Sequence, residues 1–595
     1  MKLPSLLSLW AETMAVFRRF PLQVLVTLIA VAVCILKIEN PSLTYLDKLL
    51  ACCNFSLTLL LAADLFAETH LWSEAKKWGL RIIVLVFCGL LYAVLDPHLY
   101  EADLFRILLL GFAFHLLVSF APFIGRGTVT GFWVYNERLF LQIVTAGIFS
   151  FVLTIGLYIA FASTDALFDL KSSGHVYGYI VSVTMVGFMT IFFLSGIPKD
   201  FKELDEVPQE YPKWLKIFTQ YVLIPLLSVY LLILLVYEAK ILIAWQLPKG
   251  YVSMLILGYA VAGILSLLLV YPIRNREGNG WMSIFSRFFY LMMVPLVALL
   301  LLAVWKRVSI YGITEARYVL ILLALWLTII TVYSLFSKKH NIRLIPISLC
   351  ILALLAVYGP QSAFSVSKYS QTKRLGRMMK QQTDFAKKEK AEIIKYLVTY
   401  HGILALQDFT ERDLKPLQER YEQRIGKVEN EYAVRLLQVD TAMVILNVPK
   451  YVDKKALDRD VAVSAGETID VKGFDYYRPL PDYTGEEQFD MAGHHIKIVR
   501  VGDTKVKISI DDEVKLIDVA SSLSTVTADF KAGKLKLLED SQTVYKLPGN
   551  VKDITFETSK VAGVFRLTYV FVNDGNEPST RRFDGCFLLR SKTTK

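Results

Sequence analysis

The sequence predicts an α-helical polytopic membrane protein with about eleven transmembrane helices, followed by a soluble α+β domain. Of its 595 residues, 54% are hydrophobic and 20% are charged, whereas soluble proteins are roughly 45–50% apolar and about 25% charged. The apolar excess is confined to residues 21–364, where apolar stretches follow one another at about the 20-residue length that crosses a bilayer. From Ser365 onward, Lys, Asp and Glu return at the density of a globular domain.

The chain divides by composition into four parts. Residues 1–20 form a predicted amphipathic cytoplasmic leader that ends in Arg18 and Arg19. Residues 21–364 form the transmembrane domain. Residues 365–447 carry apolar residues at helical spacing and predict a helical neck, while residues 448–595 show the alternation of strands and predict a β-rich extracytoplasmic cap.

The transmembrane domain is predicted from its apolar runs, which set the number of spans to within one. The eleven predicted spans are 21–36, 49–66, 80–95, 104–123, 139–161, 176–194, 215–237, 251–271, 284–304, 318–336 and 344–364.

The distribution of Lys and Arg predicts the orientation. Loops on the side of the N-terminus hold about twice as many Lys and Arg as the opposite loops, which places the N-terminus in the cytoplasm. An odd number of spans then places the C-terminal domain outside. A basic cluster directly after the last span opposes this orientation, although long domains translocate largely regardless of charge. The cluster consists of Lys368, Lys373, Arg374, Arg377 and Lys380.

Charge and cysteine content exclude several classes of protein. The formal net charge is +11, but much of it flanks the spans, where anionic lipid headgroups explain it, so no nucleic-acid partner is expected. Cys586 is the only cysteine outside the apolar stretches, so no disulfide is expected within the soluble domain. The chain has no paired-cysteine metal site, phosphate loop or hydrolase motif. We therefore expect no metal and no cofactor, and the sequence favours a role other than an enzyme.

Four segments resemble one bacterial family of membrane proteins, the family of the domain of unknown function 4153. They are FWVYNERLF at 132–140, KILIAWQLPKG at 240–250, RVSIYGITEARY at 307–318 and GPQSAFS at 359–365. The resemblance implies a multi-pass topology and a location in the bacterial cytoplasmic membrane. It implies no catalytic residues, because the activity of that family is unknown.

The loop at 306–318 is the first candidate for a ligand site. Arg307, Tyr311, Glu315 and Arg317 are predicted to converge near the outer membrane surface. Two arginines suit an anionic headgroup, a phosphate or a carboxylate, because guanidinium binds such groups in a bidentate fork. The alternative is a helix start with an internal ion pair.

Glu238 and Lys240 follow the apolar run that begins at Leu215. One helix from Leu215 to Trp245 would be about 46 Å long, more than the hydrocarbon core of about 30 Å. The two residues then line an outward vestibule. Alternatively, Lys240 reaches the headgroups and Trp245 anchors the helix at the interface.

Three polar residues lie within predicted spans, where ionisable groups are rare and are functional candidates by default. His115 is near the middle of the fourth span and is a candidate proton relay or a neutral imidazole bonded to a neighbouring helix. Asp64 and Asn54 make the second span polar. They either line a cavity or, for Asp64, meet water at the cytoplasmic end.

These observations favour a permease-like or transporter-like component that handles an anionic or envelope-related ligand at its outer face. The bilayer is one expected partner, and an envelope protein or lipid could bind the C-terminal domain. The first alternative is a non-catalytic anchor, sensor or assembly scaffold that presents this domain. The second is a lipid-linked glycosyltransferase, which the short first outer loop disfavours because such enzymes usually carry acids on a sizeable one.

Overall fold

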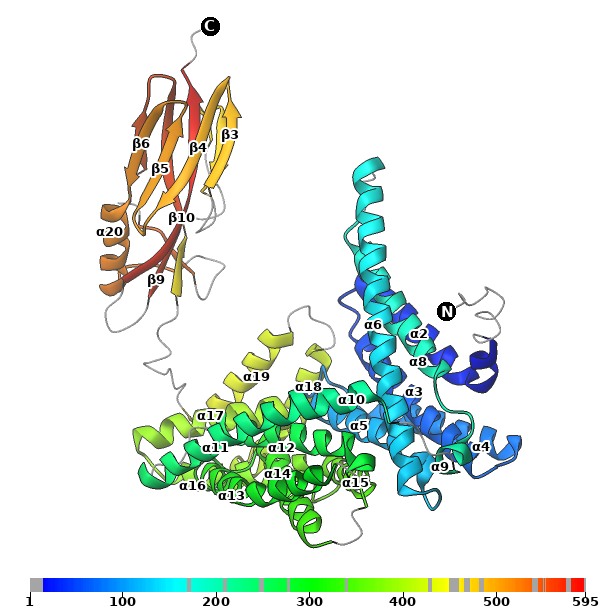
Figure 1. Ribbon diagram of the computed structural model, residues 1–595. Helices are drawn as coiled ribbons and strands as arrows, with labels where there is room; N and C mark the ends of the chain where they lie inside the picture. Colours follow the sequence, from blue (N-terminus) through cyan, green and yellow to red (C-terminus); the bar gives the residue numbers. More distant parts are fainter. Residues whose placement is uncertain are drawn as a thin grey trace. The chain divides into compact units, whose positions relative to one another are not determined.

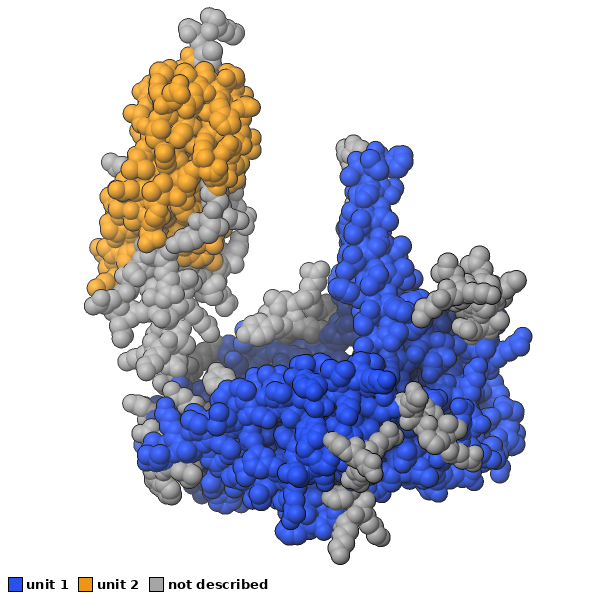
Figure 2. Space-filling view, viewed as in Figure 1, with its two compact units in different colours: residues 1–449 blue, residues 450–595 orange. Residues whose placement is uncertain are grey.

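The computed structural model divides the chain into two compact units, Met1–Pro449 and Lys450–Lys595 (Figures 1 and 2). The described residues are 14–168, 173–206, 211–244, 251–274, 279–337, 341–425, 431–448, 460–464, 471–480, 486–537, 544–548, 551, 553–573 and 579–592. Most of the leader predicted at 1–20 lies outside these residues, as do Trp245 and the end of the segment 240–250. The predicted division into four parts stays a prediction.

The described residues of the first unit form helices and the loops that connect them. Its α-helices are α2 (Pro21–Glu39), α3 (Tyr45–Thr69), α4 (Glu74–Val94), α5 (Glu101–Phe120), α6 (Val129–Phe168), α7 (His175–Val181), α8 (Met189–Ser195), α9 (Phe201–Glu206), α10 (Lys213–Phe218), α11 (Ile224–Ala244), α12 (Tyr251–Leu269), α13 (Gly280–Tyr311), α14 (Glu315–Phe336), α15 (Leu344–Val357), α16 (Ala363–Met379), α17 (Asp384–His401), α18 (Lys415–Ile425) and α19 (Glu431–Ile445). Short 3-10 helices are η1 (Ala121–Phe123), η4 (Tyr271–Ile273) and η5 (Ile403–Phe409), and π-helical turns are η2 (Ser182–Phe188) and η3 (Thr219–Leu223).

Ten helical runs among the described residues are long and apolar enough to cross a membrane, and α15 is a shorter apolar helix. The chain is therefore a multi-pass membrane protein, as predicted. Helix α15 has 14 residues and is about 21 Å long at 1.5 Å per residue. Its flanking residues nevertheless bond to both ends of the helix bundle: Arg343 donates to the carbonyl of Gly127 at 2.5 Å, and the Gln361 carbonyl accepts a hydrogen bond from Tyr318. The shorter helix thus corresponds to the eleventh predicted span.

Polar contacts define two ends of this bundle. At the end where α2 begins, Arg19 forms an ion pair with Glu68 at 2.8 Å and donates to the Pro198 carbonyl at 2.7 Å. At the opposite end, Lys37 pairs with Asp47 at 2.8 Å, and Lys48 pairs with Asp96 at 3.0 Å. Helices α16 to α19 contact the bundle at this second end, which we name the neck end.

Helix α6 begins at Val129, well before the predicted start at 139. Its first turns are anchored rather than exposed, because Tyr135 is fully buried and donates to the Val118 carbonyl at 2.9 Å. Trp133 donates to the Leu268 carbonyl at 2.6 Å. The segment 132–140 therefore serves as a packing element that joins α5, α6 and α12.

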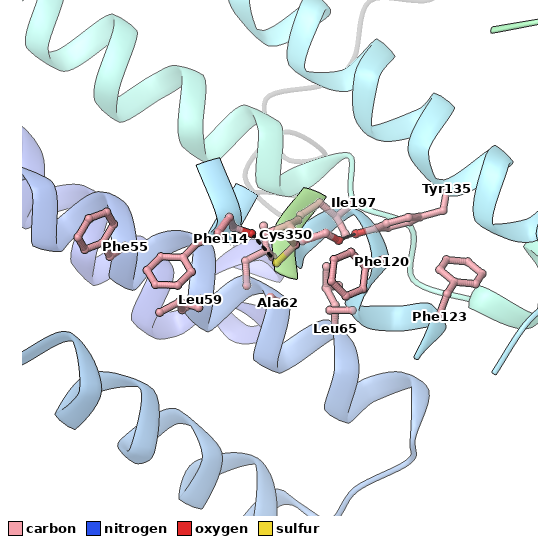
Figure 3. Packing of buried hydrophobic residues seen from close by; sticks show 14 of the residues in the cluster. Phe55, Leu59, Ala62, Leu65, Phe114, Phe120, Phe123, Tyr135, Ile197 and Cys350 are labelled. Carbon is pink, nitrogen blue, oxygen red and sulfur yellow. Dashed lines mark hydrogen bonds between the residues drawn. The ribbon is translucent and has the colours of Figure 1, made fainter. Parts of the chain in front are cut away.

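A buried cluster around α3 and α5 forms one core of the bundle (Figure 3). Phe55 and Phe114 meet edge to face with ring centroids 5.4 Å apart, and the Cys350 thiol donates to the Ala113 carbonyl at 3.3 Å. A second cluster joins α11 to α14 around Met293 and Leu300.

Asp64 lies inside the bundle in a buried ion pair. Arg81 Nε donates to its carboxylate at 2.8 Å and a second guanidinium nitrogen donates at 3.1 Å. Gln23 Nε2 adds a bond of 2.8 Å. All three side chains are buried. Asp64 of α3 therefore connects α2 and α4 through these contacts, whereas the sequence left open whether Asp64 lines a cavity or meets water at the cytoplasmic end.

The Asp64–Arg81 pair yields a stability prediction. Arg81→Met leaves the Asp64 carboxylate buried without its counter-ion, so the free energy of unfolding should fall by about 3–5 kcal/mol. The double substitution Asp64→Leu with Arg81→Met removes both charges and should restore much of this loss. Thermal unfolding of the full-length protein in detergent measures both, and equal losses for the single and double variants would contradict the assignment.

The second unit contains two β-sheets. Its elements are β1 (Asp460–Ser464), β2 (Tyr476–Pro479), β3 (Glu486–Met491), β4 (His494–Val501), β5 (Lys505–Ile510), β6 (Glu513–Asp518), α20 (Ala520–Lys531), β7 (Val544–Lys546), β8 (Ile554–Glu557), β9 (Val561–Asn573) and β10 (Ser579–Ser591). One sheet runs in the order β2-β10-β9-β1-β7 with β8 on β9, and the other is the meander β3-β4-β5-β6. The β-rich C-terminal domain is confirmed.

The two sheets share one core, which draws on inward residues of both. Ile496, Ile498 and Ile508 come from the meander, and Phe565 and Phe587 come from β9 and β10. The Phe565 and Phe587 rings lie 5.0 Å apart. This unit therefore buries an apolar core of its own.

Phe587 tests this core. Because the side chain is fully buried, Phe587→Ala should cost about 3–5 kcal/mol and speed amide hydrogen exchange in β9 and β10 of the full-length protein. Tyr477→Ala, at a side chain that is 47% exposed, is the matched control and should leave exchange nearly unchanged. Equal exchange in the two variants would contradict the described core.

Candidate functional site

The loop between α13 and α14 turns sharply at the neck end. Gly312 ends α13 with φ of +68°, a conformation that L side chains rarely adopt. A Cβ at this position would also lie 2.9 Å from Gln371 Nε2. Thr314 is the N-cap of α14, although its hydroxyl makes no capping bond. The loop is thus shaped to receive α16 against its backbone.

Glu315 opens α14 with a carboxylate that is almost fully buried. Ser367 donates to it at 2.6 Å, Tyr396 donates a second bond, and His401 Nε2 lies 3.2 Å from Oε1. All three partners belong to α16 and α17. Burial, followed by the adjacent carboxylate, raises the pKa of Tyr396 well above its ordinary value, so this phenol stays a donor.

The Tyr311 carbonyl is the second anchor of the neck. It accepts hydrogen bonds from Gln371 at 3.0 Å, Arg374 at 3.1 Å and Arg317 at 3.0 Å. Arg374 also forms an ion pair with Glu389 of α17. Burial lowers the pKa of Arg374 from its usual value.

The four residues predicted at this loop lie in different environments, and Arg307 is exposed on α13. Arg317 donates to the backbone of Tyr311 and stacks over its ring at 5.5 Å, while Glu315 faces the neck. Among the described residues, neither Arg317 nor Arg307 forms an ion pair with Glu315, in contrast to the expected convergence. Burial is the reason, because the acid end of the loop is covered by α16 and α17.

Ser367, His401 and Glu315 resemble the residue types of a hydrolase triad, but their geometry differs. In such a triad the acid and the nucleophile bond to different nitrogens of the imidazole. Here Ser367 Oγ at 3.4 Å and the carboxylate at 3.2 Å both approach His401 Nε2. Ser367 is also fully buried. The cluster therefore acts as an anchor between elements.

The later neck helices hold the start of α5. Tyr100 donates to Glu422 of α18, and Arg435 of α19 pairs with Glu101 at 2.9 Å. Burial and the adjacent Glu422 carboxylate raise the pKa of Tyr100 to about 12. The neck is therefore fixed to the bundle at α5 as well as at α14.

A cavity of about 300 Å³ lies between these two anchors. Its lining residues are Tyr100, Ala102, Arg106, Phe364, Ser365, Lys368, Tyr400 and His401. Arg106 is oriented by Asp103 and by the Phe364 ring, which its guanidinium faces at 4.2 Å. No hydrogen-bond partner is found for Arg106 Nε, and Lys368 has none among the described residues. The lining thus presents cationic and phenolic donors without a carboxylate.

A smaller cavity of about 50 Å³ lies near the end where α2 begins. Arg274, Tyr290 and Tyr333 face it together with apolar residues of α12, α13 and α14. Cationic and hydroxyl groups therefore line a cavity towards each end of the bundle.

The remaining predicted residues lie apart from both cavities. Glu238 is half-buried and Lys240 is exposed on α11, which continues from α10 through η3 as one long run. His115 is exposed on α5 and bonds through Nδ1 to the Gly111 carbonyl of its own helix at 2.7 Å. Asn54 is exposed on α3. No described contact brings these four residues together.

Comparison with known proteins gives a family for the chain. A family described as "Domain of unknown function (DUF4153)" matches residues 25–397, which is well over half of the sequence. The chain belongs to this family. The match ends inside α17, so the DUF4153 region includes the Glu315 loop, Ser367 and Tyr396.

One relative of this DUF4153 protein is described only as uncharacterized and comes from Pasteurella multocida (strain Pm70). It is 26% identical over 336 residues, which are 54% of this chain and 54% of the relative. The aligned part spans about half of that relative's length. No solved structure matches the chain.

The sequence did not identify the partners of Glu315. Ser367 and Tyr396 are 52 and 81 residues away from it along the chain, beyond the reach of any local pattern. In the sequence, Arg106 is one charge at the start of the predicted span 104–123, and Lys368 is one member of the basic cluster after the last span. The sequence signal that remains is an acid in the first turn of an apolar helix, at Glu315, which marks the residue but not its partners.

Glu315 provides a test of the neck anchor. Glu315→Gln replaces an acceptor with an amide that brings its own donors against Ser367 and Tyr396. The expected loss is about 1–3 kcal/mol of unfolding free energy, together with faster proteolysis of the neck. Glu411→Gln, at an exposed glutamate of the neck, is the control. A Glu315→Gln protein as resistant as this control would argue against the anchor.

Proposed function

We propose that this protein is a permease-like membrane component that receives an anionic ligand in the neck-end cavity. The observation that carries this proposal is the cavity of about 300 Å³ with Arg106, Lys368 and His401 in its wall. This volume is at the lower bound of small-molecule sites. The ligand class agrees with the anionic ligand expected from the sequence, but the residues that bind it differ from those of the loop at 306–318.

The charge of the lining supports an anion. Lys368 brings an ammonium without a counter-ion among the described residues, and Arg106 keeps guanidinium nitrogens beyond the one that binds Asp103. Guanidinium and ammonium donors bind phosphate and carboxylate oxygens through charge-assisted bonds. Tyr400 adds a phenol whose raised pKa keeps it protonated, whereas the hydroxyl of Tyr100 is already donated to Glu422.

The orientation follows from the Lys and Arg distribution. With the N-terminus in the cytoplasm, the neck end and its cavity face the outside of the bacterial cytoplasmic membrane. Ten membrane-length helical runs and the shorter α15 among the described residues are compatible with this placement, since the neck contacts the end opposite to the start of α2. The ligand then reaches the cavity from the cell envelope.

Binding to the purified full-length protein tests the site. Phosphate, pyrophosphate, sulfate and citrate serve as probes in thermal-shift and calorimetric titrations. Arg106→Gln combined with Lys368→Gln should weaken binding at least about tenfold, since a hydrogen bond to a charged group contributes about 1.5–3 kcal/mol. Lys395→Gln, at an exposed lysine of α17 outside the cavity, should bind like the unmodified protein.

Two results would contradict the proposal. If no probe binds, or if the double variant and Lys395→Gln bind equally well, the cavity is not an anion site. Flux of the binding anion across proteoliposomes tests the permease-like role separately. Binding without flux would restrict the protein to a receptor or sensor.

A second candidate function is an anchor or scaffold that presents the C-terminal unit. Its own core and the meander β3-β4-β5-β6 support this candidate. Strand β3 is an edge of that sheet, and edge strands accept added strands from partners. If the protein with Arg106→Gln and Lys368→Gln still binds a partner, that result would favour this role.

A further inference from the structure

The basic cluster that follows the last span is divided by the structure into an inward and an outward part. Arg374 turns inward, where it bonds to the Tyr311 carbonyl and pairs with Glu389. Lys368, Lys373, Arg377 and Lys380 are exposed. No ion pair involves these four residues among the described part of the chain. We name Lys373, Arg377 and Lys380, with Tyr369 beside them, the α16 basic face.

Helix α16 carries no Asp or Glu of its own. Like charges at positions i and i+4 destabilise a helix by about 0.2–0.5 kcal/mol, and Lys373 and Arg377 have this spacing. Contacts on its other face hold such a helix in place, and a negative surface beside the basic face stabilises it further.

The helix also lies across the end of the bundle instead of projecting from it. Ser367, Ser370, Gln371 and Arg374 all contact the loop 311–315. These positions span about 10 Å of helix at 1.5 Å per residue. Since α16 begins a few residues after the apolar helix α15 ends, the basic face stays near the membrane boundary.

We infer that the α16 basic face binds anionic lipid headgroups of the leaflet at the neck end. Lys and Arg close to an anionic membrane surface are attracted to it, with an effect that falls off within a Debye length. The exposed Tyr369 ring, which Lys373 faces at 5.7 Å, adds an amphipathic side chain of the kind enriched at interfaces. The binding partner of the α16 basic face is therefore the bilayer surface. A soluble anion would instead bind in the adjacent cavity.

Lipid selectivity of the reconstituted full-length protein tests this inference. Spin-labelled phosphatidylglycerol and phosphatidylcholine report the relative association of each lipid with the protein by electron paramagnetic resonance. We expect a preference of about fivefold for phosphatidylglycerol, the ratio that one well-placed Lys or Arg contributes at an anionic surface. It should diminish in 0.5 M salt.

The variant Lys373→Gln, Arg377→Gln and Lys380→Gln should reduce this preference to near unity. It leaves Lys368 unchanged, so its outcome is independent of the cavity. The control Lys507→Gln, Lys515→Gln and Lys531→Gln removes the same charge from exposed positions of the second unit and should retain the preference.

The inference is overturned if both triple variants show the same lipid preference as the unmodified protein. It is also overturned if the purified protein shows no preference, which would assign the face to an acidic protein partner or to solvent. Equal melting temperatures of the two variants confirm that a changed preference does not come from unfolding.

Discussion

The buried carboxylate of Glu315 is the constraint on which the junction of membrane helices and neck depends. A carboxylate removed from water costs several kcal/mol unless hydrogen bonds and charge replace its hydration. Every described donor to this carboxylate comes from the neck: Ser367, Tyr396 and His401. Helices α16 and α17 therefore stabilise the start of α14 at Glu315. Helices on both sides of this junction belong to one compact unit that continues to Pro449.

The same junction gives each residue of the Tyr311–Glu315 segment a separate physical role. Tyr311 offers the carbonyl that three donors share, Gly312 takes a positive φ where a Cβ would meet Gln371, and Ile313 donates its backbone N–H to Ser370 at 2.9 Å. Thr314 ends the turn in an extended conformation and Glu315 supplies the buried charge. A substitution at almost any of these positions would disturb the contact with α16.

The length of the apolar runs and the alternation of apolar residues are enough to predict much of the fold. A bilayer requires long apolar helices, and a sheet with two different faces requires alternating residues. These two patterns predicted about eleven spans and the strands around Ile496, Val506, Val561 and Phe587. The pairing of side chains from distant parts of the chain leaves no such pattern in the sequence. Arg81 lies at the start of the predicted span 80–95 with no partner indicated by the sequence, yet it extends inward to Asp64 because α4 begins at Glu74 and brings its second turn beside α3. Asn54 and His115 read as interior polar groups but are exposed, because helix rotation depends on neighbours that a single sequence does not identify.

The basic residues after α15 have different effects during membrane insertion and after folding. Membrane insertion acts on an unfolded chain, in which Lys368, Lys373, Arg374, Arg377 and Lys380 are equivalent and all oppose translocation. Folding makes them unequal, because Arg374 becomes part of the anchor while the others remain on the surface. The four outward charges form no ion pair among the described residues, and Lys373 and Arg377 repel each other along the helix. A negative surface on the same side of the membrane offsets that repulsion. The cluster is therefore better explained by where it lies after folding than by the direction in which the chain inserts.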